Sequence, residues 1–162
     1  MKIYVPTLLV VLIDQLSKIW IKTNFDLWET KEIIGSIIKF SHVRNTGIAF
    51  GIPVGEWGIV ITVLSFVATL FIGYLHWQER YNHHLIVVGL SMVLGGAIGN
   101  LIDRSAIFFA ARYQGVVDFI DIGFGVNRWY TFNIADSAVT IGIALYILHS
   151  IIDKSKVVEG NG

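Results

Sequence analysis

The sequence predicts an all-α membrane protein: a bundle of four transmembrane helices with a small extracytoplasmic β-hairpin or sheet and a short surface helix or loop. Hydrophobic residues make up 54% of the chain and charged residues only 15%, whereas soluble domains carry about 25% charged residues. Four segments are long and apolar enough to cross a bilayer core, which takes roughly 20 helical residues. Most of the tryptophans lie near the ends of these segments, where indole rings favour the headgroup region.

The spans differ in how directly the sequence marks them. The second has no charged residue between Glu56 and Glu79, and the third has none between Arg80 and Asp103. The apolar start of the first resembles the h-region of a secretory signal peptide, but no small-residue cleavage site follows it, so we interpret it as a retained span. The predicted spans cover residues 3–21, 57–77, 85–102 and 130–152.

Two long connections lie on the side of the bundle opposite the termini. In the first, the β-branched run at 37–43 and the apolar residues at 48–50 flank Gly47, which predicts a hairpin that turns at this glycine. In the second, the apolar piece at 106–111 can lie along the membrane surface. The density of lysine and arginine favours cytoplasmic termini, but their raw number favours the opposite orientation.

Polar side chains from separate spans lie at one depth in the same leaflet. At a rise of about 1.5 Å per residue, Asp14 lies roughly 12 Å below the end of the first span and Asp136 roughly 10 Å below the start of the fourth. An ionisable residue in a bilayer costs on the order of 3 kcal/mol, so each needs a partner or a function. Asp14 and Lys18 share a helix face and can pair. The same level also holds Asn100, Asp103, Arg104 and Asn133, with Asn45 and Asp118 in the connections on that side.

This one-sided distribution favours an enzyme. A small polytopic transporter or proton-translocating protein, the alternative function, needs polar steps through the whole membrane thickness. An enzyme that acts on a membrane-embedded substrate needs water only at the depth of the bond it breaks. The spacing of these polar residues also allows a purely structural interpretation, in which they form a shallow polar layer that connects the loops to the helices. The formal net charge of zero and the lack of a basic run indicate that nucleic acid is not a partner.

Three chemistries can be weighed. The chain has no cysteine, so a thiol nucleophile is excluded. A serine with Lys18 as base is the main rival, but Ser17 points about 100° away around the helix, and Ser137 reaches Lys18 only through tertiary contact. The histidines are scattered and do not predict a metal site; His42 is interpreted as a surface residue of the hairpin.

Two carboxylates are the better option. Held close together in a partly dry site, they cannot both ionise, so they share one proton. One can then protonate a peptide carbonyl oxygen while the other takes a proton from water. Spacing alone does not choose the pair among the candidates Asp14, Asp103, Asp118, Asp121 and Asp136.

Five segments carry most of these polar residues. They read DQLSK at 14–18, NTGIAF at 45–50, GGAIGNLIDR at 95–104, VVDFID at 116–121 and FNIAD at 132–136. Together they resemble the motifs of the lipoprotein signal peptidases, or signal peptidase II, the aspartic peptidases of bacterial membranes. The resemblance runs nearly end to end. Ile48 stands where the family more often has a smaller residue, and Val139 stands where it has isoleucine.

The resemblance implies that Asp118 and Asp136 are the catalytic pair. It implies cleavage of prolipoprotein signal peptides just before a diacylglyceryl-modified cysteine, at the outer leaflet of the bacterial cytoplasmic membrane, with both termini cytoplasmic. No metal or organic cofactor is implied, and we expect one integral membrane peptidase domain over residues 1–162, acting as a monomer. The residues expected to bind substrate or support the site are Asn45, Asn100, Arg104, Asn133, Asp14, Lys18 and Asp103.

Overall fold

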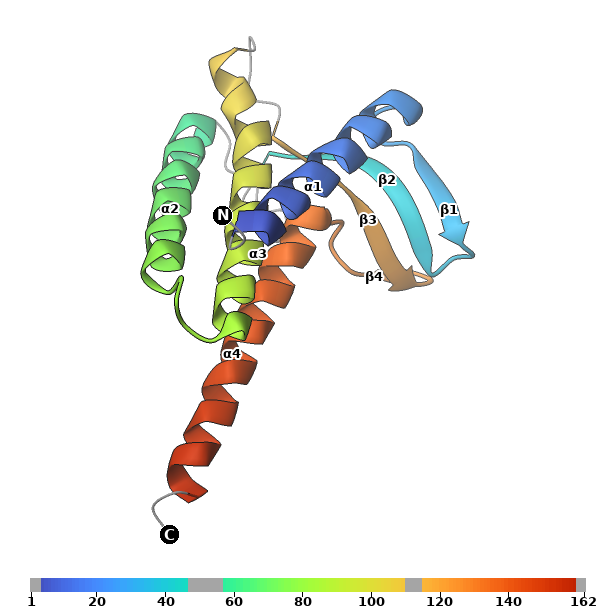
Figure 1. Cartoon of the computed structure of the whole chain (residues 1–162). Helices are drawn as coiled ribbons and strands as arrows, with labels where there is room; N and C mark the ends of the chain where they lie inside the picture. Colours follow the sequence, from blue (N-terminus) through green and yellow to red (C-terminus); the bar gives the residue numbers. More distant parts are fainter. Residues whose placement is uncertain (1–3, 47–56, 110–114, 160–162) are drawn as a thin grey trace.

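A computed structural model describes residues 4–46, 57–109 and 115–159 of the chain. Four long helices and a small antiparallel sheet make up the fold (Figure 1). The helices are α1 (Val5–Asn24), α2 (Gly58–Gln78), α3 (His84–Ser105) and α4 (Ile134–Glu159), and a 3₁₀ turn, η4 (Ala106–Phe108), follows α3. The sheet has the strand order β1 (Thr30–Ile34), β2 (Ile38–Asn45), β3 (Val116–Phe124) and β4 (Asn127–Arg128).

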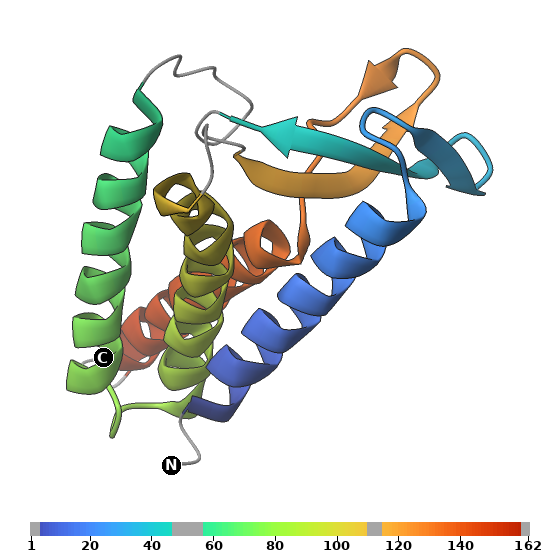
Figure 2. The same ribbon diagram turned by 90° about the horizontal axis from the view of Figure 1, so that it is seen from above.

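The helix α3 is the centre of the bundle, since it packs against α1, α2 and α4. The sheet lies beside the C-terminal end of α1 and the N-terminal end of α4, as Figure 2 shows from above. α1 and α3 run toward the end of the bundle at which α2 and α4 begin (Figure 1). The alternation of direction expected for successive spans is therefore present.

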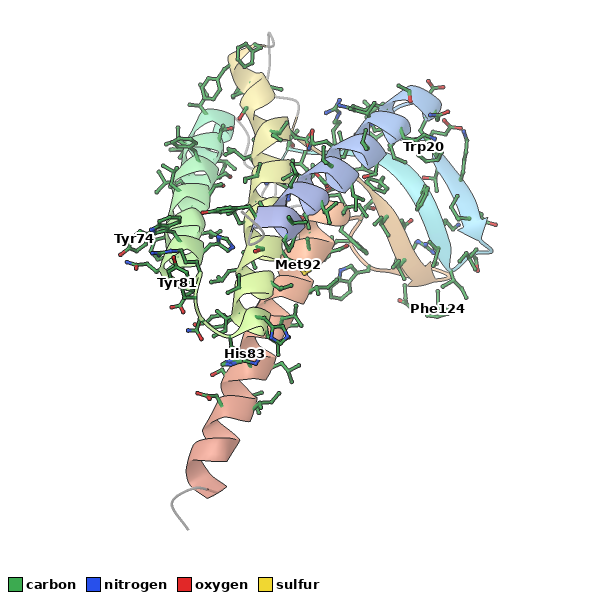
Figure 3. The ribbon with its side chains drawn as sticks, in the orientation of Figure 1. Trp20, Tyr74, Tyr81, His83, Met92 and Phe124 are labelled. Atoms are coloured by element: carbon green, nitrogen blue, oxygen red, sulfur yellow. The ribbon has the colours of Figure 1, made fainter. Side chains whose placement is uncertain are left out.

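Three described helical segments are long and apolar enough to cross a membrane: Gly58–Gln78, His84–Phe108 and Ile134–Asp153. They correspond to the second, third and fourth predicted spans. Large apolar and aromatic side chains cover their outer surfaces; Tyr74, for example, projects outward from α2 (Figure 3). α1 is not in this set, and it carries Asp14 and Lys18 in its interior.

The fourth helix begins at Ile134, four residues after the predicted start of that span. Phe132 forms an isolated antiparallel β-bridge with Ile120 of β3: its N–H donates to Ile120 O at 3.0 Å, and its carbonyl accepts from the Ile120 N–H at 2.7 Å. Because these bonds keep the chain extended, the helix cannot start before the sheet contact ends. The described helix therefore begins inside the predicted span 130–152, and the membrane boundary of that span stays a prediction.

The first strand of the predicted hairpin exists as β2, and its predicted turn at Gly47 lies outside the described residues. A described hairpin turn lies at Gly35, between β1 and β2, where the backbone has a positive φ of 48°. The other side of β2 is occupied by β3 from the second connection. The expected strand at 48–50 lies outside the described residues, as does the end of the apolar piece at 106–111, of which η4 is the described part.

His42 is buried and not a surface residue. Its exposed fraction is 7%, and its Nδ1–H donates to the carbonyl of Phe25 at 3.0 Å. Phe25 directly follows α1, and His42 lies on β2. His42 therefore ties β2 to the end of that helix, which the sequence pattern did not reveal.

A small apolar core joins the sheet to the end of α1. It consists of Ile21 and Phe25 from the helix and Val117 and Phe119 from β3, each at most 6% exposed. Since side chains alternate along a strand, Val117 and Phe119 point to this core while Asp118 points to the opposite face. The core thus fixes the direction in which Asp118 projects.

Gly96 allows α3 to lie against the start of α4. A Cβ at this position would meet the carbonyl oxygen of Ala135 and would lie 2.7 Å from Val139 Cγ2. We expect Gly96→Ala to lower the free energy of unfolding by about 1–3 kcal/mol, the usual cost of overpacking. Gly73→Ala is the matched control, because its Cβ would meet only Leu94 Cδ1, at 3.8 Å. Thermal unfolding in detergent measures both variants, and equal stability would contradict this account of the helix contact.

Candidate active site

Asp118 and Asp136 come from two elements that backbone hydrogen bonds hold together. Asp118 lies on β3, and its residue is 2% exposed. Asp136 lies in the first turn of α4. The Phe119 and Ile120 N–H groups both donate to Phe132 O, at 3.0 and 2.7 Å. The strand that carries one carboxylate is thereby fixed to the segment that leads into the other.

Asp136 also stabilises the start of its own helix. Asn133, the residue before α4, accepts a hydrogen bond on Oδ1 from the Asp136 N–H at 2.9 Å. In return, Asp136 Oδ2 accepts from the Asn133 N–H at 3.2 Å. This reciprocal pair is a capping box built from asparagine and aspartate. The carboxylate therefore has a fixed position at the positive end of the helix dipole.

Two asparagines hold the Asp118 carboxylate. Asn45 Nδ2 donates to Oδ2 at 2.9 Å, and Asn133 Nδ2 donates to Oδ1 at 2.6 Å. Asn133 thus contacts Asp118 with its side chain and Asp136 with both its backbone and its side chain. It bridges the two carboxylates.

The surroundings of Asp118 favour its protonated form. Burial, and secondarily the nearby negative charge of Asp136, raise the pKa of Asp118 to about 7. The hydrogen bonds from Asn45 and Asn133 and the charge of Lys18 act in the opposite direction. A carboxyl group in this state carries a proton near neutral pH, as one member of a proton-sharing pair must.

A buried charge cluster lies beneath the two carboxylates. Lys18 Nζ contacts Asp14 Oδ2 at 2.8 Å and Asp103 Oδ2 at 2.7 Å, and the Lys18 and Asp14 side chains are fully buried. Asp14 Oδ1 also accepts from the Ala135 N–H at 2.9 Å, so a residue of α1 caps the start of α4. We call Asp14, Lys18 and Asp103 the charge cluster.

Asn100 connects the charge cluster to the carboxylate pair. Its Oδ1 accepts from Lys18 Nζ at 3.0 Å and from Asn133 Nδ2 at 3.2 Å. Its Nδ2 donates to Asp136 Oδ1 at 2.8 Å. A continuous chain of hydrogen bonds therefore runs from α1 through α3 to α4.

The carboxylates open into a cavity of about 850 Å³. Its polar wall includes Arg104, whose buried Nε has no hydrogen-bond partner among the described residues. Its other walls are mainly apolar or aromatic. The lining residues are Asn45, Asn100, Arg104, Val116, Asp118, Trp129, Tyr130, Phe132, Asp136, Ser137, Val139, Thr140 and Ile141.

The structure brings together all nine residues singled out from the sequence: Asp14, Lys18, Asn45, Asn100, Asp103, Arg104, Asp118, Asn133 and Asp136. It does not bring Asp121 to the cavity, because Asp121 pairs with Arg128 at 2.7 Å. Sequence reasoning missed Gln15, whose amide donates to Asp14 Oδ2 at 3.0 Å and to Gly99 O at 3.1 Å. Neighbouring positions on a helix do not face each other, so the position of Gln15 next to Asp14 did not predict these hydrogen bonds.

The rival chemistries find little support in the geometry. Lys18 is occupied by two carboxylates, and the Ser137 hydroxyl donates to Asn133 O at 3.0 Å. A serine–lysine pair is therefore not assembled. Among the described residues, no group of three or more histidine, aspartate or glutamate side chains is placed to hold a metal ion.

Comparison with known proteins gives one consistent family. A family model described as signal peptidase (SPase) II matches residues 6–152. The lipoprotein signal peptidase of Shouchella clausii is 40% identical over 149 residues, which cover 92% of each chain. That of Syntrophus aciditrophicus is 34% identical over 152 residues, 91% of this chain and 90% of its own. A solved bacterial membrane enzyme superposes with a TM-score of 0.81 at 30% identity, over 96% of this chain and 90% of that one.

The raised pKa of Asp118 predicts a titration near neutrality. The protonated carboxyl should dominate below pH about 7 and the carboxylate above it. An infrared carbonyl band that is absent from Asp118→Asn should therefore disappear as the pH rises through that value. Asn45→Ala removes a donor that favours the ionised form, so the band should persist to higher pH. Loss of the band near the ordinary aspartate pKa of about 3.9 would contradict this reading.

Proposed function

The chain belongs to the signal peptidase II family, and from this premise we propose that Asp118 and Asp136 are its catalytic pair. The family makes it an aspartic peptidase of a bacterial membrane that removes signal peptides from prolipoproteins. A transporter function is not favoured. The observation that carries the residue assignment is the bridge of asparagines: Asn133 bonds both carboxylates, and Asn100 bonds the second.

In the proposed reaction, water attacks the peptide carbonyl carbon directly. Asp136, with a fixed position at the positive end of α4, takes a proton from the attacking water. Asp118 gives its proton to the carbonyl oxygen. The product of this step is a neutral tetrahedral diol, and the pair has exchanged which member carries the proton.

The second step breaks the carbon–nitrogen bond. Asp136 gives its proton to the leaving nitrogen, and Asp118 recovers a proton from a hydroxyl of the diol. A carboxylic acid and an amine leave, and both aspartates return to their starting states. No covalent intermediate with the enzyme forms, which agrees with the lack of an assembled nucleophile in the described part of the chain.

Cleavage next to a diacylglyceryl-modified cysteine suits the walls of the cavity. Val139 and Ile141 continue along α4 from the carboxylates, and Trp129 and Tyr130 flank them. Such a surface can accept an apolar chain from the bilayer. The buried Arg104 Nε–H and the amides of Asn45 and Asn100 offer donors to the substrate backbone. We infer no metal or organic cofactor for this chemistry.

We infer that α1 also crosses the membrane, in addition to α2, α3 and α4. Its buried residues are Thr7, Asp14, Lys18 and Ile21, which share one face against the bundle. Its other faces expose mainly apolar side chains, among them Leu9, Leu12 and Leu16. Because the interior charges are paired and turned inward, the outward surface suits lipid.

The proposed arrangement is one integral membrane domain, acting as a monomer without nucleic acid. Both termini lie in the cytoplasm, and the carboxylates face the outer leaflet. The alternating helix directions (Figure 1) support termini that lie on one side of the membrane, and the density of lysine and arginine favours the cytoplasm as that side.

Replacement of either aspartate should abolish turnover without unfolding the protein. We expect Asp118→Asn and Asp136→Asn each to lose nearly all cleavage of a purified lipidated prolipoprotein, and the double variant to be little worse, because the two groups act as one unit. Asp121→Asn is the matched control, since Asp121 lies on the same strand but pairs with Arg128, and it should retain most activity. Substantial turnover by Asp136→Asn would rule out the proposed pair.

The orientation can be tested with single cysteines in this cysteine-free chain. Ser36→Cys and Ser105→Cys lie at the sheet end of the bundle, and Ser155→Cys lies toward the other end of α4. An impermeant thiol reagent applied to intact spheroplasts should label the first two only. Labelling of Ser155→Cys with none at Ser36→Cys would reverse the proposed topology.

A further inference from the structure

The contacts of Asn100 point to a role for Lys18 beyond neutralising buried carboxylates. We propose that Lys18 is a positioning residue that fixes the direction of the Asn100 side-chain amide and so keeps a hydrogen-bond donor on Asp136. This inference rests on the proposed function, because it takes Asp136 to be one of the two catalytic groups.

Three oxygen atoms surround the ammonium group of Lys18. Its Nζ contacts Asp14 Oδ2 at 2.8 Å, Asp103 Oδ2 at 2.7 Å and Asn100 Oδ1 at 3.0 Å. An ammonium group has three N–H donors and no acceptor. One N–H donates to Asn100 Oδ1, the two carboxylates pair with the positive charge, and the side chain is fully buried.

An ammonium group can face only the oxygen of an amide. With Oδ1 of Asn100 turned to Lys18, its Nδ2 must face the other way, where it donates to Asp136 Oδ1 at 2.8 Å. The flipped amide would put an NH₂ group against the ammonium and a carbonyl oxygen against the Asp136 carboxylate. Both contacts would be repulsive, so Lys18 selects the orientation that serves the reaction.

Asn133 exerts a weaker constraint on the same amide. Its Nδ2 lies 3.2 Å from Asn100 Oδ1 but 2.6 Å from Asp118 Oδ1. A charged donor at 3.0 Å is the stronger of the two partners of Asn100 Oδ1. The orientation of Asn100 therefore depends mainly on Lys18 of α1, whose described hydrogen bonds and ion pairs go to Asn100, Asp14 and Asp103 and to neither catalytic carboxylate.

A purely structural role makes a different prediction. In that case Lys18 would matter only because it neutralises Asp14 and Asp103, and any neutral replacement would be equally harmful. In the proposed role, a neutral replacement that still donates a hydrogen bond should preserve the direction of the amide. Lys18→Gln and Lys18→Met form the matched pair, since both remove the charge and only glutamine keeps a donor.

The test measures kcat and KM for cleavage of a lipidated prolipoprotein by the purified, full-length variants. Lys18→Met should lower kcat by about tenfold to a hundredfold, as loss of an orienting residue typically does, with KM little changed. Lys18→Gln should retain clearly more of kcat. In an Asn100→Leu background the difference between the two replacements should disappear, because the amide they act on is gone.

Equal kcat for Lys18→Gln and Lys18→Met, or a difference that persists without the Asn100 amide, would overturn the proposal. If these variants do not fold, the same pair is compared in an Asp103→Asn background, which restores the native net charge of minus one to the charge cluster. The fate of the proposed function is read separately: turnover by Asp136→Asn refutes the catalytic pair, whereas an inactive Asp136→Asn with equal Gln and Met variants refutes only the role of Lys18.

Discussion

The buried ammonium group of Lys18 organises the meeting of the helices at the site. An ammonium group without water is costly unless carboxylates and other acceptors surround it. Asp14 on the same helix and Asp103 and Asn100 on α3 meet that need. Since Asp14 also caps α4 through Ala135, one buried cation brings three helices to a common depth.

The sheet provides the other half of the site. Alternation along β3 sends Val117 and Phe119 into the core at the end of α1 and leaves Asp118 on the opposite face. Backbone bonds between β3 and Phe132 then hold that strand to the start of α4. Asp136 is therefore held by Asn100 and by the cap at the start of α4, and Asp118 is held by its strand. The two supports meet in Asn133.

The sequence predicted the features that depend on composition and on local spacing. The charge-free stretches gave α2 and α3, and the common depth of the polar residues was visible from helix rise alone. Spacing did not choose between Asp118 and Asp121, and the pair came from resemblance to a family. A prediction of β3 as a strand would have shown that Asp118 and Asp121 point to opposite faces of the sheet, because they lie three positions apart.

Other features depend on tertiary contacts. The pairing of β2 with both β1 and β3, and with it the turn at Gly35, joins segments from two separate connections and has no local signal in the sequence. The start of α4 at Ile134 follows from the backbone hydrogen bonds between Phe132 and Ile120. These two residues are too far apart in the sequence for a local pattern to predict their contact. The charged residues Asp14 and Lys18 in the interior of α1 lower the mean hydropathy of that segment. Whether its outer surface is apolar therefore depends on which of its faces packs against the bundle.

Direct activation of water by two carboxylates can be tested by single-turnover cleavage in water enriched in oxygen-18, with hydroxylamine present. We expect the new carboxylate of the signal peptide to contain oxygen from solvent, and we expect no hydroxamate to form. Capture of the signal peptide as a hydroxamate would instead reveal a covalent acyl-enzyme and rule out direct attack by water.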